Sequence, residues 1–123
     1  MSQKEDLLLK LFLQVTKSDR LHFGYWNATD PQDWASLHPA QVKYSELFLK
    51  QIPPGTRSVL DVGCGIGTDA ALMQSRGYAV SCVSPDKIQQ EIIGKKYGAK
   101  LKFYCNKFEE LELADKFDLI TMM

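Results

Sequence analysis

Residues 59–68 read Val-Leu-Asp-Val-Gly-Cys-Gly-Ile-Gly-Thr, and this stretch decides which fold the chain can adopt. Its first four residues are typical of a short buried strand, and its last residue opens a helix predicted over Thr68–Ser75. Three glycines alternate between them, where glycine permits a sharp turn and lets a ligand approach the backbone closely. A strand, a glycine loop and a helix in this order predict the start of a parallel α/β sheet.

Downstream of this loop, strand and helix patterns continue to alternate. Strands are predicted over Tyr78–Val83, Leu101–Cys105 and Phe117–Thr121, and a second helix is predicted over Pro85–Lys96. Alternation of this kind indicates βαβ units. The sequence therefore predicts an α/β fold with a Rossmann-like parallel sheet and flanking helices.

Upstream of the loop the pattern is helical. Apolar residues at helical spacing predict a helix over Lys4–Thr16, whose apolar face we expect to meet a core or a partner. A second helix is predicted over Pro39–Gln51, with Pro39 near its start. We divide the chain into an N-terminal helical cap segment, residues 1–55, and a Rossmann-like half-domain, residues 56–123. Because the last strand runs close to the final residue, we expect a truncated sheet with an unpaired edge.

The loop spacing and one acidic residue indicate what kind of ligand the loop binds. Dinucleotide sites prefer Gly-x-Gly-x-x-Gly, whereas Gly63, Gly65 and Gly67 are evenly spaced and Thr68 replaces the third dinucleotide glycine. Asp61 places a negative charge two residues before the loop, which suits an ammonium and a sulfonium better than a pyrophosphate. S-adenosylmethionine carries both cations. The loop spacing and Ser84, which follows the second strand, both disfavour a nicotinamide or flavin oxidoreductase.

The full phrase VLDVGCGIGTDA, residues 59–70, resembles the first motif of class I S-adenosylmethionine-dependent methyltransferases. The resemblance extends from about residue 20 to the end and implies an incomplete methyltransferase fold, since the family usually continues through three more strands. It implies methyl transfer to a small-molecule acceptor, with this chain supplying the cofactor-binding half. The alternative is a non-catalytic, truncated module that associates with itself or with a partner chain.

The resemblance also implies which residues hold the cofactor. The first motif contributes Asp61, Gly63, Cys64, Gly65 and Gly67. The end of the second strand contributes Ser84, Asp86 and Gln89. Ser84 stands where the family often has an acid that binds the ribose hydroxyls, so Asp86 or Gln89 is expected to take over that task. For Asp86, stabilisation of the first turn of the next helix is an equally good interpretation.

Two further segments resemble parts of the family's cofactor site. Lys107 and Phe108 follow the third strand and resemble the family's segment that packs beside the adenine. Lys107 stands where that segment commonly has an acid. For Phe108, burial in the core is the competing interpretation. Tyr25 and Trp26 resemble part of a segment that folds over the cofactor in several small-molecule methyltransferases, where cation–π contact with the sulfonium is expected. Here too, core packing is the alternative.

No catalytic residue is predicted. Methyl transfer from a sulfonium is an in-line displacement with a good leaving group, so holding the acceptor in place supplies much of the rate. A general base is needed only when the acceptor must lose a proton, and His22 is a weak candidate for that role.

Composition narrows the expected partners and surroundings. Fifteen Lys and Arg residues balance 15 Asp and Glu residues, which gives no basic excess for nucleic acid, and no apolar run is long enough for a membrane span. Cys64, Cys82 and Cys105 lack metal-type spacing, so we expect no metal site, reduced thiols and a cytoplasmic protein. We expect a small-molecule acceptor as partner, with a second copy or a partner chain covering the final strand.

Overall fold

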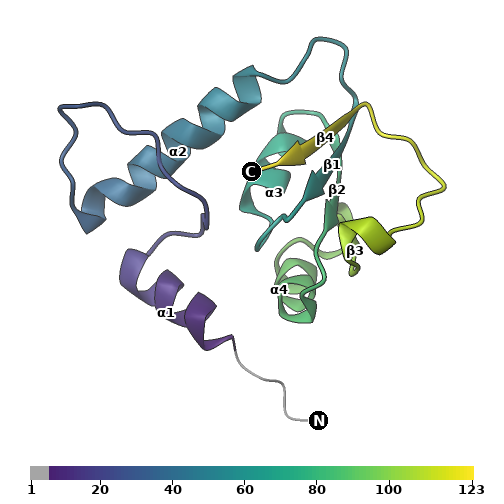
Figure 1. Ribbon diagram of the computed structural model, residues 1–123, viewed down its shortest axis with the longest axis horizontal. Coiled ribbons are helices and arrows are strands. Elements are labelled where there is room, and N and C mark those ends of the chain that lie inside the picture. The colour runs from purple at the N-terminus through teal and green to yellow at the C-terminus, as the bar shows by residue number, and fades with distance from the viewer. Residues whose placement is uncertain (1–5) are drawn as a thin grey trace. The chain divides into compact units, whose positions relative to one another are not determined.

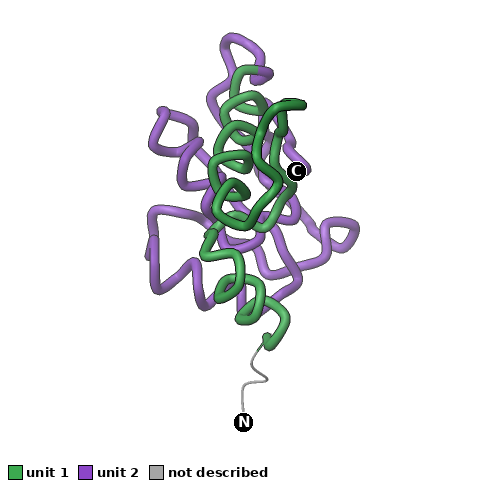
Figure 2. Tube along the Cα trace, turned by 90° about the vertical axis from the view of Figure 1, so that its left-hand side faces the viewer, with its two compact units in different colours: residues 1–50 green, residues 51–123 purple. Residues whose placement is uncertain are grey.

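The computed structural model describes residues 6–123, which belong to two compact units, Met1–Lys50 and Gln51–Met123 (Figure 2). The boundary predicted after residue 55 falls inside the second unit. The first two residues of the helix predicted over Lys4–Thr16 lie outside the described residues. Between residues 6 and 123, no helix combines the length and the apolar character that crossing a membrane requires.

The second unit is built on a parallel sheet with the strand order β3-β2-β1-β4 (Figure 1). The bounds of the strands are β1 Ser58–Val62, β2 Ala79–Val83, β3 Lys102–Tyr104 and β4 Leu119–Met122. Helix α3 (Thr68–Ser75) connects β1 to β2, and helix α4 (Lys87–Tyr97) with the short 3-10 helix Gly98–Lys100 connects β2 to β3. The predicted α/β class and Rossmann-like parallel sheet are therefore confirmed.

The chain reverses its direction of travel across the sheet at β1. It first moves outward through β2 to β3, then returns to the opposite side of β1 to add β4, with the 3-10 helix Phe108–Glu110 on the way. The side chain of Asp118 fixes the start of β4, because its Oδ2 accepts the N–H groups of Arg57 at 2.8 Å and Ser58 at 3.0 Å. In open α/β sheets, ligands bind at the carboxyl ends of the strands beside such a reversal.

Side chains that cap helices explain where two predicted helix starts were wrong. α4 begins after Asp86 rather than at Pro85, since Asp86 Oδ1 accepts the N–H groups of Ile88 at 2.8 Å and Gln89 at 3.4 Å. α2 (Trp34–Lys50) begins before Pro39, because Asp33 Oδ1 accepts the Ser36 N–H at 2.8 Å. Pro39 thus lies inside the helix, where it removes one backbone hydrogen bond.

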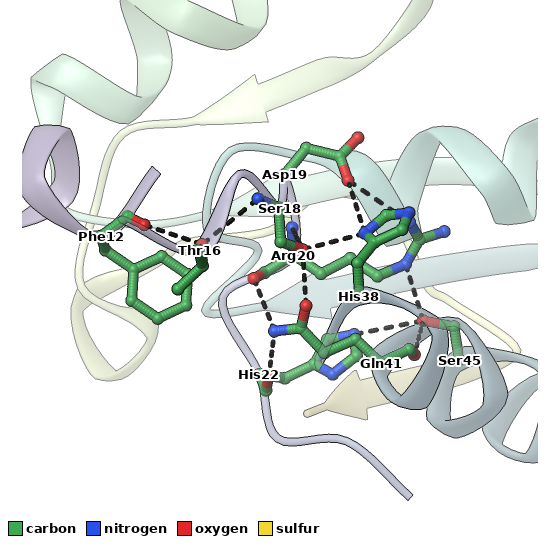
Figure 3. Close-up of polar contacts among 9 residues, drawn as sticks. All are labelled: Phe12, Thr16, Ser18, Asp19, Arg20, His22, His38, Gln41 and Ser45. Carbon is green, nitrogen blue, oxygen red and sulfur yellow. Dashed lines mark hydrogen bonds and ion pairs between the residues drawn. The ribbon is translucent and has the colours of Figure 1, made fainter. Parts of the chain in front are cut away.

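The first unit consists of α1 (Leu7–Thr16), α2 and the loop between them, which a buried polar network fixes (Figure 3). Gln41 of α2 is fully buried, and its Nε2 donates to the carbonyl groups of Arg20 at 2.9 Å and His22 at 2.8 Å. Its Oε1 accepts the hydroxyl of Ser18. The apolar face of α1 takes no part in this network and is exposed at Leu7, Leu8, Leu11 and Val15.

We expect Gln41→Ala to lower the free energy of unfolding by about 2–4 kcal/mol, because three hydrogen bonds are lost and two part-buried carbonyl groups lose their donor. Urea unfolding followed by tryptophan fluorescence measures this loss, since Trp26 and Trp34 both lie in the first unit. His38→Ala is the control: it removes one side-chain hydrogen bond, to Ser18, from a half-exposed position. Equal losses in the two variants would contradict the central role of Gln41.

Candidate cofactor site at the carboxyl edge of the sheet

The glycine loop after β1 adopts a conformation that other residues resist. Gly63, Gly65 and Gly67 have φ values of +71°, +58° and +83°, all in the left-handed region. The Gly63 N–H donates to the Val83 carbonyl at 2.9 Å, which prolongs the pairing of β1 with β2 by one residue. The Gly67 N–H then closes the turn on the Cys64 carbonyl at 3.1 Å and α3 begins.

The surroundings of the loop differ between its two ends. A Cβ atom added to Gly67 would lie 3.0 Å from Ile93 Cγ1 and 3.3 Å from a ring carbon of Tyr97, so α4 packs directly against the loop there. A Cβ atom added to Gly63 would meet nothing within 4 Å. The loop is therefore closed by packing at Gly67 and open to an approaching ligand at Gly63.

Asp61 lies next to the last residue of β1, with only 3% of its surface exposed. It is in register with Thr121 of β4, whose hydroxyl donates to Asp61 Oδ1 at 2.8 Å. Burial raises the pKa of Asp61 to about 6, the Thr121 hydroxyl opposes the rise, and the Asp69 carboxylate adds to it. None of these causes is a cation, so the ionised carboxylate is held at an electrostatic cost that a cationic ligand would relieve.

The segment after β2 carries a neutral polar pair. The Ser84 N–H donates to the Tyr104 carbonyl at 3.2 Å, and its hydroxyl donates to Gln89 Oε1 at 2.8 Å. Asp86 is the cap of α4, as described above, which matches the second of the two interpretations offered for it. Ser84 thus directly follows Val83, which is bonded to the glycine loop, and stands at the position where an acid was expected from the family pattern.

Lys107 and Phe108 follow β3 on the same edge of the sheet. Lys107 precedes the 3-10 helix Phe108–Glu110, and its Nζ lies 4.0 Å from Glu110 Oε1. Phe108 is 38% exposed, so its alternative interpretation as a core residue is wrong. Because the Ser84–Tyr104 hydrogen bond joins the ends of β2 and β3, the three segments that follow β1, β2 and β3 share one edge of the sheet.

Tyr25 and Trp26 belong to the first unit. The Tyr25 N–H donates to the Ala40 carbonyl at 2.8 Å, and both aromatic side chains are exposed rather than packed in a core. Their expected contact with the cofactor stays a prediction. In His22, Nδ1 is hydrogen-bonded to the Phe23 carbonyl at 2.7 Å and Nε2 to the Ser45 hydroxyl at 3.1 Å, so both ring nitrogens are engaged.

Three residues around Asp61 were missed by the sequence reasoning. The sequence assigned Thr121 only to a hydrophobic strand and Asp69 only to a helix. Asp69 follows the loop that begins after Asp61, and two acids so placed are a signal in the sequence that the pKa of one of them is raised. Cys82 is in register with Asp61 on β2. A hydrogen bond to Cys64, together with burial, raises the pKa of the Cys82 thiol.

Comparison with known proteins places these observations in a family. Residues 36–123 match the family described as "Methyltransferase domain". The chain belongs to this methyltransferase family. The methyltransferase GfsG of Streptomyces halstedii is 32% identical over 92 residues, which cover 73% of this methyltransferase chain and 31% of that protein. The chain therefore spans about a third of the length of this curated relative.

Solved structures agree with the methyltransferase fold. Coclaurine N-methyltransferase, bound to N-methylheliamine and SAH, superposes with a TM-score of 0.72 at 21% identity, over 96% of this chain and 36% of that one. The [4+2]-cyclase SpnF superposes with a TM-score of 0.73 at 26% identity, over 94% of this chain and 44% of that one. Both of these proteins are more than twice as long as this chain.

Proposed function

We propose that this chain binds S-adenosylmethionine at the carboxyl edge of its sheet and supplies the cofactor half of an enzyme that methylates a small molecule. The observation that carries the proposal is Asp61, a buried carboxylate. None of the groups that shift its pKa is positively charged. It lies beside a glycine loop that is open at Gly63. Family membership and the SAH-bound relative support the same cofactor.

The residues of each segment suit a different part of this cofactor. Asp61 is placed for the ammonium group, and the backbone of Gly63, Cys64 and Gly65 for close approach of the amino-acid part. Ser84 and Gln89 offer hydrogen-bonding groups for the ribose hydroxyls, while Asp86 positions the helix that carries Gln89. Exposed Phe108 and the backbone of Lys107 suit the adenine.

The chemistry assigned to this chain is positioning. When bound, S-adenosylmethionine supplies a methyl group on a sulfonium, which is already activated for displacement. The chain's residues hold the donor and exclude water from its buried end, and alignment of donor with acceptor supplies much of the rate. No residue of this chain is assigned as a general base.

The fold by itself does not fix the reaction, because SpnF shares it and is a [4+2]-cyclase. Cofactor binding and methyl transfer therefore need separate measurements. We expect saturable one-to-one binding of S-adenosylhomocysteine by isothermal titration calorimetry, and no binding of NADH. A folded protein that binds neither S-adenosylhomocysteine nor S-adenosylmethionine would sink the proposal. Binding without methyl transfer to any small molecule would favour the alternative, a non-catalytic module.

We further propose that β4 pairs with another strand, from a second copy or a partner chain, and that the protein acts in the cytoplasm. Ile120 and Met122 of β4 are exposed, and an exposed apolar edge strand favours strand pairing. The three free thiols agree with a reducing compartment. Size-exclusion chromatography with light scattering tests the pairing: a monomer at all concentrations contradicts association between copies.

A further inference from the structure

The start of α2 and the loop before it border an open hollow within the first unit. Its volume is about 780 Å³, which lies in the usual range for a small-molecule pocket. The described residues that line it are Trp26, Gln32, Asp33, Trp34 and Leu37. The chain has two tryptophans, so both of its indole rings border one hollow.

The wall formed by Trp26 is held in place by the loop that carries it. The N–H of Tyr25 donates to the Ala40 carbonyl of α2 at 2.8 Å. A Cβ atom added to Gly24 would lie 2.6 Å from Ala40 Cβ and 3.0 Å from Trp26 Nε1. The loop backbone is therefore packed against both α2 and the indole ring, and the ring is positioned before any ligand arrives.

The wall formed by α2 presents a second indole ring. Trp34 and Leu37 are three residues apart, so their side chains share one side of the helix. Trp34 is 66% exposed and Trp26 is 36% exposed, which means that neither ring is packed in a core. The face of an indole ring carries partial negative charge and attracts cations.

The charge in the hollow is negative. Asp33 is the one charged side chain among the described residues that line it. Hydrogen bonds from Ser36, whose N–H donates to Asp33 Oδ1 at 2.8 Å, lower the pKa of Asp33, so this carboxylate is ionised at neutral pH. The N-terminal end of α2 contributes about half a positive charge, which the full negative charge of the carboxylate outweighs.

We propose that this hollow binds a small organic ammonium ion with methyl groups on its nitrogen, which the indole rings of Trp26 and Trp34 contact and Asp33 balances in charge. Such an ion spreads its positive charge over an apolar surface, which suits aromatic faces. A metal ion would need several oxygen ligands, which two indole rings do not supply. The inference does not rest on the proposed function, because the hollow and the sheet belong to different units.

The indole N–H signals of the 123-residue protein report directly on the hollow. Because both tryptophans line it, a proton–nitrogen correlation spectrum contains two indole signals, which Trp34→Leu assigns. The probe is choline, and the matched control ligand is 3,3-dimethyl-1-butanol, in which a neutral carbon replaces the charged nitrogen. At constant ionic strength, we expect choline to shift both signals saturably and to bind about tenfold or more tightly than the alcohol. Equal affinities, or no shift with choline, overturn the proposal.

Three variants test the parts of the hollow one at a time. Asp33→Asn removes the charge but keeps a good helix cap, and it should weaken choline binding by about threefold or more. Trp34→Leu, at a largely exposed position, should weaken binding by about fivefold or more, as read from the Trp26 signal. Phe23→Leu is the matched control, because Phe23 is an 88% exposed aromatic residue of the same unit that does not line the hollow.

The control variant should bind choline as the wild type does. Wild-type affinity in Asp33→Asn, or an equal loss in Phe23→Leu and Trp34→Leu, overturns the assignment. Far-ultraviolet circular dichroism of each variant shows that its helices are retained. Failure of S-adenosylhomocysteine to bind would contradict the proposed function alone, since the indole signals decide the ammonium site without that ligand.

Discussion

Asp61→Asn is expected to weaken binding of S-adenosylhomocysteine by about tenfold or more at pH 7.5 and, at the same pH, to stabilise the fold. The loss of affinity follows because the carboxylate that we propose to bind the ammonium group of the ligand becomes neutral. The gain in stability follows because a buried charge without a cationic partner is removed. Asparagine has nearly the same shape, and its amide oxygen can still accept the Thr121 hydroxyl, so no cavity is created.

The pH dependence separates the two effects. The pKa of Asp61 is about 6 in the folded protein and near 3.8 when it is unfolded, so between these values the folded state binds more protons. The free energy of unfolding therefore falls as pH rises from about 4 to 6, by about 3 kcal/mol in total at most. Asp61→Asn lacks this loss, so its advantage in urea unfolding should vanish below pH 4 and be complete above pH 7.

Ligand binding should show the opposite trend. The wild type gains affinity as pH rises through about 6, because the ionised carboxylate is the form that attracts a cation, whereas the affinity of Asp61→Asn stays flat there. Asp69→Asn is the matched control, since it removes the like charge that adds to the shift and should lower the midpoint of the transition. A wild-type affinity independent of pH between 5 and 7.5 would contradict the role of Asp61.

The second large effect is expected from a pair of glycine substitutions, Gly67→Ala and Gly63→Ala. Both force alanine into the left-handed region, which costs about 1–2 kcal/mol. At Gly67 the new methyl group also meets Ile93 and Tyr97 of α4, so we expect a total loss of about 2–4 kcal/mol in the free energy of unfolding. At Gly63 the methyl group enters open space, so only the backbone cost remains.

Affinity should rank the two variants in another order. The Gly63→Ala protein stays folded but carries a methyl group where we place the ligand, so its affinity for S-adenosylhomocysteine should fall by about tenfold or more. Urea unfolding and calorimetry on both variants give the comparison. If Gly63→Ala binds as the wild type does, the ligand does not lie against this part of the loop.

The sheet and the glycine loop were predictable because their signals are local. A buried strand, alternating glycines and a helix follow one another within residues 59–75, and the later strands repeat the pattern. The surroundings of Asp61 were not predictable in this way. Its bond to Thr121 joins residues 60 positions apart, and only the register of β4 against β1 brings them together.

Two further details depend on local capping geometry. The sequence left two roles open for Asp86; the structure shows the helix cap, in which Oδ1 accepts two backbone N–H groups, and the role in cofactor binding stays a prediction. Pro39 was predicted to lie near the start of its helix, but the helix begins five residues earlier, at Trp34. The Asp33 side chain caps that earlier start by accepting the Ser36 N–H, so Pro39 falls in the second turn. The prediction of the helix start from sequence did not include the cap at Asp33.

β4 is held in place at both of its ends, by the Asp118 carboxylate on the N–H groups of Arg57 and Ser58 and by the Thr121 hydroxyl on Asp61. The stretch between β3 and β4 therefore has little part in aligning the strand. Evolution is free to lengthen or rewrite that connection, as surface loops commonly allow, without shifting the hydroxyl away from the acid. Changes in that connection could therefore alter ligand preference among related proteins without disturbing the sheet.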